Sequence, residues 1–322
     1  MKTNDFCKKK RYNLQKNSDM KIAVYGRNII ASINNYISML NVLKANDFEF
    51  HIYADFAKFL LEKTSDFCEC CTFSTEQDLN SDFSFFVSFG GDGTFLEATR
   101  FIRKNNIPII GINTGSLGFL ASVSIDEFSD VINEIIYKKY EVQHRNLIHV
   151  ETVDKSILTC ALNEITLQRK MPELISTTVT IGGELLSQCW SDGLIIATPT
   201  GSTAYSLSVG GPVIEPSASA FVISPIAPHN LAVRPFVVAD EVEIRIKLHT
   251  RGDKAMFTAD TEMQEIVSGT EFIVKKSPYK VNIIKPNSVD FYKTLRNKLM
   301  WGYDIRNDIN VYQHFDNKKK QK

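Results

Sequence analysis

Short apolar runs alternate with helical patterns in the N-terminal part of the chain. Apolar, strand-like runs occupy residues 21–26, 51–53, 83–89 and 107–112. Residues 28–44 instead carry isoleucine and leucine at the spacing of one helical face. Strands that alternate with helices predict an α/β domain with a mostly parallel, Rossmann-like sheet.

The pattern changes near residue 142, and apolar and polar residues alternate from there to residue 283. Over 242–248 every second residue is apolar and the residues between are charged. Such alternation is typical of a strand with one buried face. Glycine-containing turns at 181–184, 251–253 and 268–270 separate the runs. This part of the chain predicts an all-β domain.

Helical spacing returns over residues 289–307 and carries Leu295, Leu299 and Trp301, so we expect this segment to pack back on the first domain. The expected organisation is a disordered extension at 1–19, an α/β domain at 20–142, a β domain at 143–283, a returning segment at 284–310 and a tail at 311–322.

Charge and composition exclude several classes of protein. The 322 residues hold 37 Lys and Arg against 37 Asp and Glu, so the chain lacks the basic excess of a nucleic-acid binder. No apolar run is long enough to span a bilayer, and no apolar segment of a secretory signal follows the basic N-terminus. The six cysteines are scattered, which suggests reduced thiols in a cytoplasmic protein.

A glycine-rich turn, S-F-G-G-D-G-T-F-L-E at 88–97, follows the apolar run 83–89. Thr94 and Glu97 fit a capping box at the start of a helix. The turn therefore lies at the carboxyl end of a strand, where open α/β sheets bind ligands and helix amides attract anions. The carboxylate of Asp92 is unexpected in such a place.

The common phosphate-binding loops do not fit this turn, because no lysine follows Gly93 and no G-x-G-x-x-G is present. Asp92 could accept a proton from an attacking hydroxyl, or hold Mg²⁺ against phosphates. Alternatively, it only caps the helix. A second loop with three glycines, at 111–120, follows the next strand. We expect the two loops to line one crevice.

Two polar stretches stand out in the predicted β domain. Asn163 and Glu164 interrupt the apolar run 158–167, and both can reach one ligand only if the strand ends or bulges there. Otherwise they are an ordinary polar pair on an edge strand. The hydroxyl-rich stretch 198–206 follows a buried strand and suits a polyhydroxylated or phosphorylated ligand. Tyr205 could stack on a base or simply pack.

Taken in order, the stretches 90–94, 113–119, 163–164, 192–193 and 198–211 resemble the NAD kinase family. The first alone is weakly specific, because diacylglycerol kinases and phosphofructokinases carry similar loops, but the ordered set is strongly specific. Residues 295–302 look like the C-terminal end of members from Bacteroidetes. The resemblance covers residues 21 to about 307.

The resemblance implies an α/β domain, a sandwich-like β domain and a C-terminal segment that returns to the first. It also implies a reaction in which ATP, or polyphosphate, phosphorylates the 2′-hydroxyl of the adenosine ribose of NAD to give NADP. Mg²⁺ would accompany the donor, and the protein would form a homodimer or homotetramer. A lipid or sugar kinase and a non-catalytic dinucleotide sensor are the competing interpretations.

The resemblance implies that Asp92 is the proton acceptor and Glu164 the ribose ligand. Phe119 would pack near the adenine and Asp192 near the nicotinamide half. No residue is expected to bind a metal directly. The other expected binding residues are Gly93, Asn163, Trp190, Thr203, Ala204, Tyr205, Ser206, Leu207, Ser208, Ala227, Asp260 and Glu262. Asp260-Thr261-Glu262 stands where family members often carry Asp-Gly-Gln, so the contacts of its last two residues are expected to differ.

Overall fold

The computed structural model describes residues 20–302 apart from 66, 68, 69, 116, 117, 171 and 253, so the expected extension at 1–19 and tail at 311–322 lie outside the described residues. Its first half contains the predicted parallel sheet. The strands run in the order β5-β4-β1-β2-β3, and β6 pairs with β5. Their bounds are β1 (Lys21–Gly26), β2 (Glu49–Tyr53), β3 (Thr72–Phe73), β4 (Phe83–Phe89), β5 (Ile109–Asn113) and β6 (Val123–Ser124).

Helices cover both faces of this sheet. The apolar side chains of α1 (Ile33–Ala45), α2 (Ala54–Lys63) and α4 (Phe128–Ile136) pack on one face, and those of α3 (Asp92–Thr99) pack on the other. Short 3₁₀ turns lie at η2 (Ile30–Ser32) and η3 (Glu76–Asp78). The helix expected at 28–44 therefore begins later, because residues 30–32 form a tighter turn and Ser32 makes no capping hydrogen bond.

The second half is a β-sandwich, as expected. One sheet has the order β14-β13-β12-β9-β16-β17, and the other contains β11, β10, β15, β18, β7 and β8. Apolar residues from both sheets form one core between them. The bounds are β8 (Leu158–Ala161), β9 (Glu164–Arg169), β10 (Ile175–Ile181), β11 (Glu184–Ser191), β12 (Gly193–Ala197), β13 (Ala220–Ile226), β14 (Phe236–Ala239), β15 (Ile244–Thr250), β16 (Lys254–Ala259) and β17 (Glu262–Val267).

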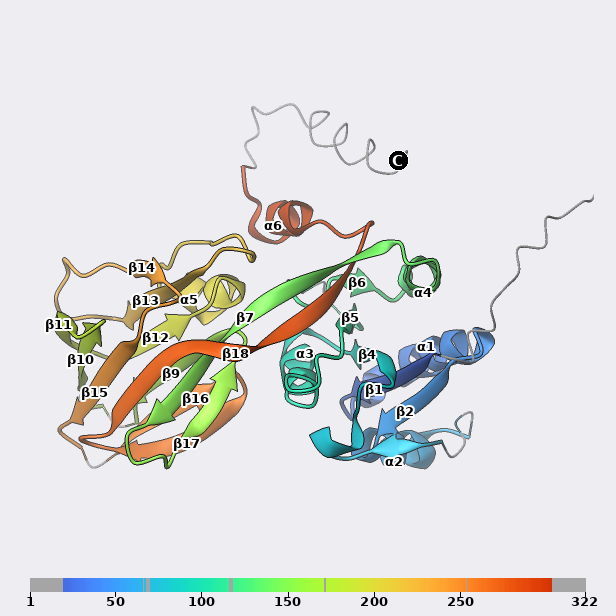
Figure 1. Cartoon of the computed structure of the whole chain (residues 1–322), viewed down its shortest axis with the longest axis horizontal. Helices are drawn as coiled ribbons and strands as arrows, with labels where there is room; N and C mark the ends of the chain where they lie inside the picture. The colour runs from blue at the N-terminus through green and yellow to red at the C-terminus, as the bar shows by residue number, and fades with distance from the viewer. Residues whose placement is uncertain are drawn as a thin grey trace, which may run out of the picture.

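Two long antiparallel strands, β7 (Tyr140–Thr152) and β18 (Glu271–Pro286), cross from one half to the other (Figure 1). β18 pairs with β15 near its start and runs parallel to β5 near its end, at Ile283 and Ile109. The boundaries expected near residues 142 and 283 fall inside these strands. The halves thus share one continuous sheet, which restrains their relative orientation.

The segment after β18 returns to the α/β half, as expected. Helix α6 (Phe291–Leu299) begins at Asp290, whose side chain accepts a hydrogen bond from the Tyr292 N–H. The ring of Phe291 lies 6.2 Å from that of Phe119, centroid to centroid. α6 therefore packs beside the second glycine loop.

Candidate active site

The carboxylate of Asp92 joins the two glycine loops. It accepts hydrogen bonds from the backbone N–H groups of Phe119 (2.9 Å), Leu120 (3.0 Å) and Ala121 (2.9 Å). Gly90 in turn donates its N–H to the carbonyl oxygen of Ile112. The expectation that both loops line one crevice agrees with these contacts.

The capping box expected at Thr94 and Glu97 is wrong. Gly91 is the N-cap and its carbonyl oxygen accepts the N–H groups of Thr94 and Phe95, so α3 already begins at Asp92. The side chain of Glu97 turns away and accepts from the Tyr25 hydroxyl (3.0 Å) and from the guanidinium of Arg27. Asp92 is thus no simple cap, because its carboxylate binds another loop rather than its own helix.

A cation that the sequence analysis missed lies over the first glycine loop. Arg27 follows β1 directly, and Gly26 pairs with Phe89, the last residue of β4. A Cβ atom on Gly93 would come 3.7 Å from Nη2 of Arg27. Arg27 therefore supplies the positive charge that the loop lacks. A basic residue at the carboxyl end of the neighbouring parallel strand was the available signal.

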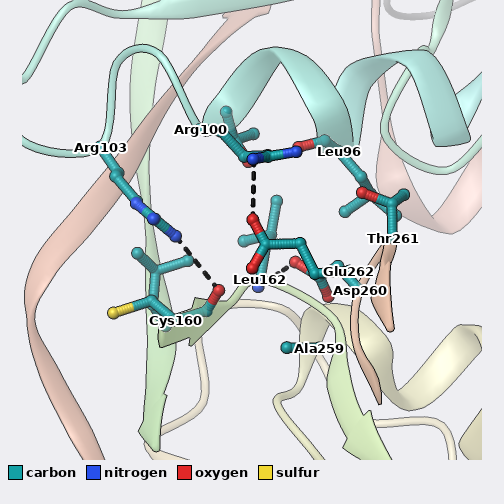
Figure 2. A pocket seen from close by; sticks show the side chains of 11 residues that line it. Leu96, Arg100, Arg103, Cys160, Leu162, Ala259, Asp260, Thr261 and Glu262 are labelled. Atoms are coloured by element: carbon teal, nitrogen blue, oxygen red, sulfur yellow. Dashed lines mark hydrogen bonds and ion pairs between the residues drawn. The ribbon is translucent and has the colours of Figure 1, made fainter. Parts of the chain in front are cut away.

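Of the two alternatives left open at Asn163 and Glu164, the structure has the strand break, since β8 ends at Ala161 and β9 begins at Glu164 and pairs on both sides. The Asp260 carboxylate holds the break by accepting N–H groups from Leu162 (2.7 Å), Asn163 (2.8 Å) and Glu164 (3.2 Å). Figure 2 shows the contact with Leu162. Asp260 occupies the turn between β16 and β17 with a left-handed backbone (φ 49°). The same arrangement as at Asp92, one carboxylate on three successive amides, is repeated here.

Two oxygen atoms at this break are buried without a hydrogen-bond partner among the described residues, namely Oδ1 of Asn163 and Oε2 of Glu164. Burial, together with the charge of Asp260, raises the pKa of Glu164 to about 8, against the opposing effect of the Tyr205 N–H. Burial raises the pKa of Asp260 to about 6, although its three N–H donors oppose this. Buried polar atoms normally have partners. A bound polar ligand would complete these two.

The hydroxyl-rich loop is fixed to the same break. It contains η4 (Thr200–Thr203) and α5 (Tyr205–Ser208). The Thr198 hydroxyl donates to the carbonyl of Leu162 (2.6 Å), and a Cβ on Gly201 would overlap the Asn163 backbone. The Tyr205 hydroxyl accepts from Gln168 (2.7 Å). The expected site residues from 203 to 208 thus lie alongside β9.

Trp190, Asp192 and Ala227 lie at the other end of the neighbouring strand. The Asp192 N–H donates to Ile226, and its carboxylate pairs with Arg169 (3.0 Å). β12 separates Asp192 from Thr198, a span of about 20 Å at ordinary strand rise. A ligand that touches both ends must therefore be elongated.

Glu262 bridges the two halves of the molecule. Its carboxylate pairs with Arg100 (2.9 Å) and accepts from the Thr159 hydroxyl (3.1 Å). Arg103 nearby donates to the carbonyl of Cys160, and these groups border a cavity beneath α3 (Figure 2). Glu262 therefore already has partners on both sides of the junction.

The described part of the chain has neither a cluster of metal ligands nor a membrane-spanning helix. There, no group of three or more His, Cys, Asp or Glu side chains is placed to hold a metal ion. None of the described helices is both long and apolar enough to cross a membrane. Cys71, Cys160 and Cys189 are free thiols.

Comparison with known proteins gives consistent matches over nearly the whole chain. Residues 42–140 match the model of the ATP-NAD kinase N-terminal domain, and residues 162–286 match that of the ATP-NAD kinase C-terminal domain. The NAD kinases of Flavobacterium psychrophilum and Christiangramia forsetii are 41% and 40% identical to it, each over 294 residues that make up 89% of this chain and all of the relative.

Solved structures agree with this assignment. The yeast NADH kinase complexed with NADH superimposes with a TM-score of 0.79 at 25% identity, over 90% of each chain. An NAD kinase from Archaeoglobus fulgidus in complex with ATP gives 0.67 at 27% identity, over 87% of this chain and 99% of the other. The chain belongs to the NAD kinase family and is a phosphotransferase that converts NAD to NADP.

Proposed function

We propose that Asp92 receives the proton of the 2′-hydroxyl of the adenosine ribose as ATP phosphorylates NAD. The observation that carries this proposal is the fixed Asp92 carboxylate between two glycine loops, with the guanidinium of Arg27 close to the neighbouring Gly93. An ionised carboxylate offers about four acceptor positions. The three backbone amides use three, and the hydroxyl takes the fourth.

The chemical step follows from this placement. The 2′-oxygen attacks the γ-phosphorus of ATP, the bond to the bridging oxygen of ADP breaks, and the proton moves to Asp92. Arg27 has three N–H donors besides the two that bind Glu97. These stabilise the charge on the transferring phosphoryl group, as basic residues do in other phosphotransferases.

NAD binding is assigned to the strand break and the hydroxyl loop. The unpaired oxygens of Glu164 and Asn163 accept from the ribose hydroxyls and the adenine amino group. Asp192 lies toward the nicotinamide half, at a distance that fits an elongated dinucleotide. The likeness to a kinase solved with NADH and to one solved with ATP supports both substrate assignments.

Mg²⁺ enters this proposal only with the donor. Since the described residues offer no cluster of metal ligands, they do not fit a protein-bound ion, and no step is assigned to it. Phosphate oxygens and water commonly hold Mg²⁺. A cytoplasmic homodimer or homotetramer is the proposed state, which light scattering of the purified protein would measure.

The direct experiment mixes purified protein, NAD, ATP and Mg²⁺, and detects NADP with an NADP-specific dehydrogenase. We expect NADP with ATP, and parallel reactions with polyphosphate or NADH define the donor and acceptor range. A sugar or lipid kinase would form no NADP and would consume ATP only when its own acceptor was added. A sensor would bind NAD and form none. Either outcome would contradict the proposal.

Gly118→Ala is expected to lower turnover by up to about 10²-fold in a folded protein, because a displacement of about 1 Å at a reacting group can cost that much. A Cβ at this position would overlap Oδ1 of Asp92 and push the carboxylate out of its amide contacts. Steady-state kinetics beside circular dichroism measures the effect. Gly115→Ala is the matched control, since its Cβ would come no nearer than 3.8 Å to Asn113. Equal losses in both variants would refute the specific role of the Asp92 contacts.

Glu164→Gln is expected to weaken the pH dependence of stability. Because the folded pKa lies above the ordinary 4.5, the folded protein binds more protons than the unfolded chain between about pH 4.5 and 8. The free energy of unfolding therefore falls as pH rises through this window, by at most about 1.4 kcal/mol per pH unit for this group. The glutamine variant lacks this contribution. Denaturant titrations at both ends of the window measure it, and parallel curves for the two proteins would contradict the buried, protonated state.

A further inference from the structure

A cavity on the far side of the second glycine loop holds a buried cation that the reaction does not use. The cavity encloses about 460 Å³, including some open solvent space, between β7, the end of β18, the loop and α6. Its lining residues are Phe119, Leu120, Ser122, Gln143, Arg145, Ile283, Ile284, Lys285, Val289, Phe291 and Thr294. None of these described residues is acidic. The polar groups that face this space are thus two cations, two hydroxyls and one amide.

Arg145 is the central group of this cavity. Its Nε is buried and has no hydrogen-bond partner among the described residues, while Nη2 donates to Gln143 (2.6 Å). Burial lowers the pKa of Arg145 to about 10, and Glu215 is the acid whose charge opposes this. The Glu215 carboxylate is itself bound by Ser217. A buried guanidinium with so few partners is costly unless an anion completes it.

Helix α6 and Lys285 add positive charge around the cavity, and aromatic rings line part of it. The nine residues of α6 include Lys293, Arg296 and Lys298 and no acid, and Nζ of Lys298 lies 5.1 Å from the centre of the Phe119 ring. Lys285 at the rim pairs with Glu141, which is well exposed. Arg145 and Gln143 lie between the two stretches that match the family models, and α6 lies beyond them. Five of the eleven lining residues, including Arg145, therefore lie outside the two matched segments.

We propose that this cavity, here called the Arg145 pocket, is a second anion-binding site that takes a phosphate-bearing ligand. The guanidinium of Arg145 binds the phosphate oxygens, as arginine does elsewhere with paired N–H donors. Ser122 supplies a hydroxyl group, the Thr294 hydroxyl already donates to the carbonyl of Asp290, and Phe291 contacts an apolar part of the ligand.

The Arg145 pocket is coupled to the reaction through the loop. Phe119 and Leu120 border the pocket, and their backbone N–H groups hold Asp92. A ligand that moves these residues therefore alters the position of the carboxylate. The effect on the reaction rests on the proposed role of Asp92. The binding of an anion in the Arg145 pocket does not depend on that role.

Thermal unfolding of the purified full chain without NAD tests the binding. Inorganic phosphate, AMP and adenosine are titrated separately at constant ionic strength. We expect phosphate and AMP to raise Tm in a concentration-dependent way and adenosine to have no effect. A stronger response to AMP than to phosphate identifies a nucleotide as the ligand, and equal responses identify free phosphate. Equal stabilisation by adenosine and AMP would overturn phosphate recognition.

Variants decide where the anion binds. Arg145→Met is expected to weaken phosphate binding at least about tenfold. Its Tm without phosphate should stay unchanged or rise, because the variant removes an unpaired buried charge. Lys285→Gln at the rim should also weaken phosphate binding. This variant tests the Arg145 pocket without changing a buried residue. Arg27→Gln keeps the wild-type response. If Arg27→Gln loses the response and Arg145→Met keeps it, the anion binds at the glycine loop. That result would overturn the Arg145 pocket and leave the proposed function intact.

Discussion

Asp92→Asn is expected to lower turnover by at least about 10²-fold while the protein still folds and binds NAD. Oδ1 of Asp92 accepts two N–H groups and Oδ2 accepts one. The amide oxygen of asparagine will therefore take the place of Oδ1, and its NH₂ group will replace the oxygen that faces the hydroxyl. The variant then lacks the proton acceptor. Turnover is followed as NADP formation, and NAD affinity by calorimetry.

The thermal stability of the same variant separates chemistry from folding. Loss of one hydrogen bond to a charged group costs on the order of 1.5–3 kcal/mol, which lowers Tm but leaves a folded domain. A near-normal turnover in the folded variant would mean that Asp92 only holds the two glycine loops together and takes no part in catalysis. A loss confined to stability would lead to the same conclusion.

Glu164→Ala has the second large expected effect, on NAD affinity. Truncation removes a buried acceptor that has no partner within the described chain. Because this carboxyl is largely protonated at neutral pH, the loss is that of a ribose hydroxyl left without its buried partner, about 1–3 kcal/mol, which weakens NAD binding roughly 5- to 150-fold. The Michaelis constant for ATP should change little. Calorimetry with NAD and steady-state kinetics with varied ATP measure the two quantities.

Glu265→Ala is the matched control, because this glutamate pairs with Lys170 and Lys254 on the solvent side of the same domain. Exposed ion pairs contribute little to stability, so the affinities for NAD and ATP should both stay unchanged. If Glu164→Ala lowers the affinity for ATP and leaves the affinity for NAD unchanged, the assignment of this residue to NAD is wrong.

Local patterns in the sequence predicted the elements that carry the site. β4 has the predicted bounds, and the glycine loop follows it because glycine and apolar residues specify such a turn locally. The sequence left a strand break and an edge-strand polar pair as alternatives at Asn163 and Glu164, because adjacent side chains share a face only where a strand ends or bulges. The fold class followed from the change of period near residue 142.

Local sequence patterns did not predict the contacts between residues that lie far apart in the chain. The capping box failed because Glu97 binds Arg27, 70 residues away, in place of its own helix end. Asp260 holds the amides of residues 162–164 from almost 100 positions away, and no periodicity encodes that. The long strands β7 and β18 were divided at expected domain boundaries, because alternation does not show which sheet a strand joins.

The central claim is that Asp92 faces the 2′-position, and the ratio of NADP to NAD affinity tests it most directly. NADP carries a phosphate dianion at that position, and an ionised carboxylate beside it is repulsive in a partly desolvated cleft. Calorimetry on wild type and Asp92→Asn, at one pH and one salt concentration, measures both affinities. The account predicts that the variant binds NADP more tightly relative to NAD than the wild type does. An unchanged ratio would mean that Asp92 does not face the 2′-hydroxyl, and would contradict the mechanism.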